Sequence, residues 1–113
     1  MTAYRGEIWL ANLNPVKKNN EVGKVRPVLI LQNDDLNESS YPTTVILPLT
    51  TSLVEDAQPL RMRICKRENL KEDSDILIAQ IRAIDNERLI EKLCVLSAKE
   101  LKIVKQLLDE VLT

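Results

Sequence analysis

Short apolar runs separated by polar turn segments constrain the fold of this chain more than any other feature of its sequence. The runs are rich in Val, Ile and Leu, and the segments between them contain Asn, Asp, Ser, Pro and Gly. This pattern is typical of strands joined by tight connections. The sequence predicts about five or six strands, at residues 7–13, 25–33, 43–52, 60–65, 75–85 and 90–96.

Within these runs the side chains alternate between two faces. In residues 60–65 the apolar side chains are predicted to face the core, whereas Arg61 and Arg63 face solvent. Residues 75–85 are read as one strand, with Leu77, Ala79 and Ile81 on one face and Ile76, Ile78, Gln80 and Arg82 on the other. The polar segments 34–42 and 66–75 are predicted to be loops, and the acidic residues of 68–75 to face water.

The end of the chain predicts one amphipathic helix. Ser97 is suited to cap it, and Glu100, three residues later, completes a capping box. Apolar residues then recur at helical spacing, at Leu101, Val104, Leu107, Leu108 and Val111. At 113 residues the chain suits a single domain spanning 1–113. The predicted fold class is α+β and mainly β, a small, partly open barrel with a C-terminal helix.

Scarcities in the composition exclude several kinds of site. The sequence has no histidine, which excludes Ser-His-Asp, Cys-His and zinc-hydrolase mechanisms. Its only glycines are Gly6 and Gly23, too few for a phosphate-cradling loop. Tyr4, Trp9 and Tyr41 are its only aromatic residues, too few for a base-stacking platform. Because the net charge is −1, binding to nucleic acid would need a local patch.

The cysteines and the apolar runs bear on the environment of the protein. Cys65 and Cys94 match neither a metal-ligand spacing nor a disulfide framework. No apolar run approaches the roughly 20 residues that span a bilayer, and the first residues lack the apolar core of a signal peptide. We therefore expect a reduced, cytoplasmic protein that needs neither metal nor cofactor and does not associate with membranes.

What remains is electrostatic chemistry at the ends of strands. Arg26 opens the second predicted strand, and Thr50, Thr51 and Ser52 close the third. An arginine is permanently charged and donates two parallel hydrogen bonds to phosphate. RNA carries its own nucleophile, the 2′-hydroxyl, so a histidine-free ribonuclease is chemically feasible. An arginine beside a proline is nevertheless commonly a surface residue, and these residues alone indicate only a small β-rich domain with a candidate anion site.

Five blocks of the sequence resemble MazF/PemK-type toxins of toxin–antitoxin modules in order and spacing. They are RGEIWLANLNP, KVRPVLILQND, TVILPLTTS, DSDILIAQIRAID and LSAKELKIV, and together they cover most of the chain. The resemblance implies an SH3-like barrel of the MazF/CcdB type. It also implies an endoribonuclease that cuts single-stranded RNA, typically mRNA, without metal. The expected products carry 2′,3′-cyclic phosphate and 5′-hydroxyl ends, and the cleavage inhibits translation and growth.

The resemblance also implies partners and residue roles. Such toxins form homodimers with RNA in a groove across the interface, and a MazE-like antitoxin with a partly disordered segment neutralises them. The catalytic residues of the family fall on Arg26 and Thr50. Its substrate-binding positions fall on Glu21, Lys24, Asn33, Thr51, Ser52, Gln80 and Arg82. The loop around Glu21 reads KKNNEVGK, which departs from the usual family pattern, so its base preference cannot be transferred from relatives.

Two other functions compete with the ribonuclease. A CcdB-like toxin on the same barrel would poison DNA gyrase by binding it, using the surface of the C-terminal helix. The end of this helix, LLDEVLT, lacks the aromatic terminus expected of such a tail. A plain SH3-like interaction module would need aromatic walls around its ligand groove, and three aromatic residues hardly supply them.

Overall fold

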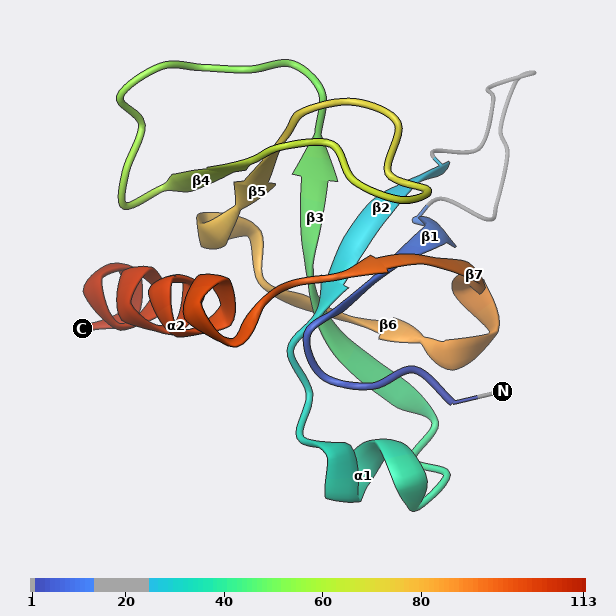
Figure 1. The fold of residues 1–113 in the computed structure, drawn as a ribbon. Coiled ribbons are helices and arrows are strands. Elements are labelled where there is room, and N and C mark those ends of the chain that lie inside the picture. The colour runs from blue at the N-terminus through green and yellow to red at the C-terminus, as the bar shows by residue number, and fades with distance from the viewer. Residues whose placement is uncertain (1, 14–24) are drawn as a thin grey trace, which may run out of the picture.

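The computed structural model describes residues 2–13 and 25–113, and all structural statements below refer to them. Their strands join in one sheet, accompanied by two α-helices and two short 3-10 turns (Figure 1). In chain order the elements are β1 (Glu7–Asn12), β2 (Val25–Ile30), α1 (Asp34–Glu38), β3 (Thr43–Thr50), β4 (Arg61–Ile64), β5 (Ser74–Leu77), η1 (Ile78–Gln80), β6 (Arg82–Asp85), η2 (Asn86–Arg88), β7 (Leu89–Val95) and α2 (Ala98–Leu112).

Every pairing in the sheet is antiparallel, and β3 lies at its centre. The strand order is β4-β5-β3-β2-β1-β7, and β6 pairs with β3 beside this path. The outer strands β4 and β7 do not pair with each other, so the sheet stays open, as expected for a partly open barrel. The end of β3 that carries Thr50 lies near β4 and β5, whereas α1 lies beside the other end (Figure 1).

Pro48 lies where β3 exchanges one neighbouring strand for another. On one side, residues 46–48 of β3 are paired with β2. On the other side, the pairing of β3 with β6 ends at Ile46, and its pairing with β5 begins at Leu49. The Leu31 amide donates to the Val45 carbonyl at 3.0 Å, which makes these two residues a hydrogen-bonded pair. Hydrogen-bonded and non-hydrogen-bonded pairs alternate along an antiparallel ladder, so Pro48 and Val28, three pairs farther on, form a non-hydrogen-bonded pair. The nitrogen of Pro48, which has no hydrogen to donate, therefore points into the interval between β6 and β5.

The alternation of side chains along the strands divides the core into two clusters. One cluster contains Leu29 and Leu47 and is covered by α2 through Val104 and Leu107, all of them buried. The second cluster lies on the other face of the same strands. It contains Ala3, Trp9, Ala11, Val28, Ile30, Ile46 and Ile84. Because β2 and β3 are apolar on both faces, their sequences are nearly continuous runs of aliphatic residues.

Several of the structural predictions made from the sequence are wrong. Residues 34–38 form the helix α1, because Asn33 caps it by accepting a hydrogen bond from the Asp35 amide and acidic residues occupy its first turn. Residues 75–85 form two strands, since the chain leaves the sheet at Ile78 for the turn η1 and re-enters it at Arg82. Leu60 precedes β4 and is 55% exposed.

The predictions of the C-terminal helix and of the last strand are confirmed. The helix α2 begins after Ser97, and both hydrogen bonds of the predicted capping box are present. The last strand, β7, is also present. Cys65 and Cys94 are free, the first exposed and the second buried. Among the described residues no helix has the length and apolar character needed to cross a membrane.

An ion pair joins the start of α2 to the segment between β4 and β5. Arg67 contacts Glu100 with both terminal nitrogens, Nη1 to Oε1 at 2.5 Å and Nη2 to Oε2 at 2.8 Å. The hydrogen bonds from Arg67 outweigh the effect of burial and, with the Ser97 amide, lower the pKa of Glu100 to about 2. Both side chains are about four-fifths buried, so the pair is only partly screened by water.

This pair predicts a pH-dependent stability. The pKa of Glu100 is 4.5 without these contacts, so its contribution is fully present above that pH and is lost as the pH falls toward 2. We expect Glu100→Gln to lower the free energy of unfolding by about 2 kcal/mol at pH 7 and by much less near pH 2.5. Urea unfolding at several pH values measures this. The exposed Glu110→Gln is the control, and equal losses in both variants at pH 7 would contradict the assignment.

Candidate functional site

Arg26 is the second residue of β2 and lies where the ladder between β2 and β3 ends. It is opposite Ala11 of β1, a small and fully buried residue. The next residue, Pro27, has no amide hydrogen and cannot complete the following pair of ladder bonds with β3, whose last pairing is Val28 with Pro48. The half-buried Arg26 side chain therefore projects from a strand that is held firmly on only one side.

Arg26 and Thr50 lie at the same end of the sheet, just beyond the last pairing of β2 with β3. That pairing joins Val28 to Pro48, and Arg26 and Thr50 each lie two residues farther along their strands. Because side chains alternate along a strand, Arg26 is on the face of Val28 and Thr50 is on the face of Pro48, which is the same face of the sheet. We call these two residues the Arg26–Thr50 pair.

The same level of the sheet continues across two more strands. Thr50 is paired with Asp75 of β5, and Asp75 is paired with Arg63 of β4. Thr50, Asp75 and Arg63 thus form one cross-strand row from β3 to β4, and Arg26 lies on β2 at the same end of the sheet. Beyond Thr50 this row leads into a hollow of about 390 Å³ lined by Val54, Glu55, Asp56, Ala57, Gln58, Arg61, Arg63 and Asp75.

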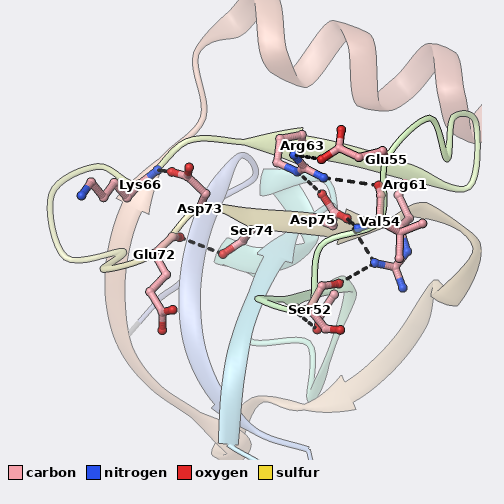
Figure 2. Close-up of polar contacts among 11 residues, drawn as sticks. Ser52, Val54, Glu55, Arg61, Arg63, Lys66, Glu72, Asp73, Ser74 and Asp75 are labelled. Carbon is pink, nitrogen blue, oxygen red and sulfur yellow. Dashed lines mark hydrogen bonds and ion pairs between the residues drawn. The ribbon is translucent and has the colours of Figure 1, made fainter.

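Asp75 is the most buried charged group of this region, with only 1% of its side chain exposed. Its two oxygens are divided between two arginines, as Figure 2 shows: Arg63 Nε donates to Oδ1 at 2.6 Å, and Arg61 Nη1 donates to Oδ2 at 3.1 Å. Burial raises the pKa of Asp75, but the hydrogen bonds from Arg63, from the Val54 amide and from Arg61 outweigh burial and hold it below its ordinary value. Asp75 is therefore a carboxylate at neutral pH.

The segment after Thr50 folds over Asp75. The Val54 amide donates to Asp75 Oδ2 at 3.0 Å, and the Ser52 carbonyl accepts from Arg61 Nη1 at 2.8 Å (Figure 2). The Ser52 amide in turn donates to Thr50 Oγ1 at 3.1 Å. The hydroxyl oxygen of Thr50 is thus fixed by one backbone hydrogen bond, and its hydrogen stays available for another acceptor.

The other residues predicted for substrate binding occupy several places. Thr51 and Ser52 are exposed beside the Arg26–Thr50 pair. Arg82 is exposed and opposite Ile46, hence on the same face of β3 as Thr50 but four residues away, roughly 13 Å along the strand. Gln80 is exposed in η1, between β5 and β6.

Asn33 lies apart from these residues. It follows the far end of β2, and its side-chain oxygen caps α1. Glu21 and Lys24 lie outside the residues that the structure describes.

Sequence reasoning missed the polar residues that surround Thr50. The prediction that the acidic residues of 68–75 face water is wrong for Asp75, because two arginines and a backbone amide compensate its charge in the interior. Arg61 and Arg63 do alternate outward from β4, as predicted, but both turn back to this carboxylate. The only signal in the sequence was that Asp75 directly precedes the apolar run that begins at Ile76, where a charged residue drawn into the interior needs partners.

The arrangement suits an anion at the Arg26–Thr50 pair. A guanidinium offers donors in a planar fork that matches two oxygens of a phosphate, and the adjacent hydroxyl can donate a further hydrogen bond. Asp75 is already paired with Arg61 and Arg63, so Arg26 is the arginine at this end of the sheet whose charge is not directed at Asp75. Within residues 2–13 and 25–113, no three His, Cys, Asp or Glu side chains are grouped so as to hold a metal ion.

The chain is similar in sequence to toxins along almost its whole length. Residues 4–112 match the model of a family described as PemK-like, MazF-like toxin of type II toxin–antitoxin system. Proteins named endoribonuclease MazF, from Staphylococcus saprophyticus and Staphylococcus epidermidis, are each 42% identical to it over 106 residues. The matched region makes up 93% of this chain and 87% of each of those proteins.

The fold is also found in solved structures. MazF from Deinococcus radiodurans superposes with a TM-score of 0.77 at 21% identity, over 99% of this chain and 97% of that one. The Mycobacterium tuberculosis toxin MazF-mt6 gives a TM-score of 0.76 at 18% identity, over 94% and 95% of the two chains. A chain from the crystal structure of MazE-MazF of D. radiodurans gives 0.78 at 20% identity, over 99% and 97%. The predicted fold class is confirmed.

Proposed function

Because this chain belongs to the PemK-like, MazF-like toxin family of type II toxin–antitoxin systems, we propose that it is a toxin that cleaves single-stranded RNA, including mRNA. The two staphylococcal relatives are both named endoribonucleases, which supports cleavage and does not favour the gyrase-poison alternative. The observation that supports the proposal is that Arg26 and Thr50 lie just beyond the last pairing of β2 with β3, at the same end of the sheet. This pair matches the chemistry of phosphodiester transfer with a nucleophile supplied by the RNA.

The proposed reaction is a transesterification. The 2′-hydroxyl oxygen of the RNA bonds to the adjacent phosphorus while the bond from phosphorus to the 5′-oxygen breaks. The products are a 2′,3′-cyclic phosphate and a 5′-hydroxyl, and the proton lost by the 2′-oxygen is balanced by the proton gained by the 5′-oxygen. Arg26 stabilises the charge that builds on the phosphate oxygens, and Thr50 donates a hydrogen bond from the neighbouring strand.

The remaining predicted residues complete the proposed site. Thr51 and Ser52 are placed to contact RNA next to the Arg26–Thr50 pair, and Arg82 and Gln80 to contact it farther along. Glu21 is the proposed base or RNA contact, Lys24 a phosphate contact, and Asn33 a contact at the far end of β2. The reaction needs no metal or cofactor.

The proposed assembly follows from the family. We infer a homodimer that binds RNA across its interface and a MazE-like antitoxin that neutralises it, since relatives of this fold include MazE-MazF and a toxin bound to its cognate antitoxin. The protein is proposed to be a single domain that acts in the cytoplasm.

The activity predicts RNA cleavage that resists chelation. We expect the purified protein to cut a single-stranded transcript equally well with and without EDTA, because neither the guanidinium nor the hydroxyl needs a metal. The new 5′ ends should carry hydroxyl groups, detected as ends that ligate only after phosphorylation, and sequencing of those ends also gives the cleavage motif. Intact RNA together with trapped gyrase–DNA complexes would instead support the CcdB-like function.

A further inference from the structure

Two backbone groups of the segment after Thr50 are fixed by a single ion pair. Asp75 Oδ2 accepts from the Val54 amide and from Arg61 Nη1, and the same Arg61 nitrogen donates to the Ser52 carbonyl. The carbonyl at 52 and the amide at 54 are thereby held to one point on β4 and β5. We name Asp75, Arg61 and these two backbone groups the Asp75 clamp.

The clamp reaches Thr50 through one further hydrogen bond. Ser52 is held through its carbonyl, and its amide donates to Thr50 Oγ1 at 3.1 Å. A hydroxyl oxygen that accepts from a fixed amide has a restricted side-chain rotamer and a restricted direction for its own hydrogen. Asp75 is also paired with Thr50 in the ladder between β3 and β5. Both the end of β3 and the segment that follows it are therefore held to Asp75.

From these contacts we propose that Asp75 and Arg61 are positioning residues, which aim the Thr50 hydroxyl at the scissile phosphate by holding the turn at Ser52 in place. This inference rests on the proposed ribonuclease function and adds two residues that touch neither RNA nor the reacting atoms. Small displacements of a reacting group lower rates strongly, by up to about 100-fold for a shift near 1 Å. The clamp is therefore expected to act on kcat rather than on RNA binding.

The negative charge of Asp75 could affect RNA cleavage in another way, and that role predicts the opposite change in the cleavage rate. A carboxylate near an RNA path repels phosphate, so if Asp75 acted only through its charge, Asp75→Asn would strengthen RNA binding and speed cleavage. If it acts as a clamp, Asp75→Asn removes one acceptor oxygen and cleavage slows. The two roles thus change the rate in opposite directions.

The central experiment is a double-mutant comparison on the full-length protein. Asp75→Asn should lower kcat about 10- to 100-fold with KM little changed. In a Thr50→Val background the same substitution should have no further effect, because no hydroxyl remains to be aimed. A residue needed only for folding would lower activity in both backgrounds, which would overturn the proposal. Asp73→Asn is the matched control: Asp73 is exposed, and its hydrogen-bond partner is the Lys66 amide rather than Arg61 or the Val54 amide (Figure 2).

Variants at Arg61 keep the test decisive if Asp75→Asn folds poorly. One nitrogen of Arg61 makes both of its clamp bonds, so the single ammonium of Arg61→Lys can replace it, whereas Arg61→Gln cannot bridge the two acceptors as a cation. We expect Arg61→Gln to reproduce the loss in kcat and Arg61→Lys to recover most of it. Equal activity of the two variants would count against the clamp.

Amide hydrogen exchange separates failure of the clamp from failure of the proposed function. The Ser52 and Val54 amides should exchange at least tenfold faster in Asp75→Asn than in the wild type, whether or not RNA is cut. Unchanged exchange at both amides would overturn the clamp and leave the ribonuclease intact. Faster exchange in a protein whose wild type cuts no RNA would overturn the ribonuclease, and with it the catalytic role of the clamp.

Discussion

Replacing Arg26 by alanine should lower kcat/KM for RNA cleavage by about 1,000-fold while the fold persists. Arg26 is the guanidinium that we propose contacts the scissile phosphate, and loss of one preorganised donor to a developing oxyanion commonly costs about 10²–10³ in rate. A full positive charge aimed at a phosphoryl group is worth at least as much. The measurement is initial-rate cleavage of a transcript whose cut site has been mapped, with the thermal midpoint recorded for each variant.

Two further variants define what Arg26 supplies. Arg26→Lys keeps the charge but loses the planar fork, so we expect about 10- to 100-fold slower cleavage than in the wild type. Arg5→Ala is the control, because Arg5 is exposed and adjoins Gly6, whose amide bonds the Ile30 carbonyl at the opposite end of β2. Wild-type activity in a folded Arg26→Ala protein would remove the proposed mechanism.

Replacing Leu29 by alanine should lower the free energy of unfolding by about 3–4 kcal/mol. Leu29 is fully buried in the cluster beneath α2, on the strand that carries Arg26. Removal of a buried leucine side chain loses its transfer free energy and leaves a cavity that the neighbouring strands can fill only in part. Because domains of this size are stable by roughly 5–15 kcal/mol, the variant should unfold at markedly lower urea concentration.

Trp9 provides the measurement for this variant. It is the single tryptophan of the sequence and is buried on the other face of the sheet, so its emission should shift to the red when the protein unfolds. Leu112→Ala, at the end of α2, is the control because that side chain is 63% exposed, and its expected loss is below about 0.5 kcal/mol. Similar losses in both variants would mean that the cluster beneath α2 is not the stabilising core.

The parts of the fold that follow from local rules were predictable. The strands of the first half alternate or run continuously apolar, and α2 has both a capping box and an apolar stripe. Residues 34–38 were missed because a helix of one turn has too little length for a periodic signal, and its cap, Asn33, also suits a turn. The break at Ile78 was missed because the turn Ile78–Gln80 contains neither Gly nor Pro, and Gln80 also fits the alternation of one continuous strand.

The site was predictable to the extent that it lies on strands. Positions for Arg26 and Thr50 come from the resemblance, whereas the pairing of β2 with β3, which puts both residues at one end of the sheet, is known only from the structure. The Asp75 clamp was not predictable, because its parts come from β4, β5 and the segment between β3 and β4, which only the folded chain brings together. Sequence spacing carries no information about such contacts.

Pro48 has a further consequence for how this site can change over evolution. If β3 slipped by one residue along β2, the nitrogen of Pro48 would turn toward β2, where the ladder requires a hydrogen-bond donor. Every side chain of β3 would also move to the other face of the sheet. The proline therefore excludes a slip of the two strands by one residue. Insertions in the connecting loops can lengthen or reshape the surroundings of the guanidinium and the hydroxyl, yet they leave these two groups in step with each other.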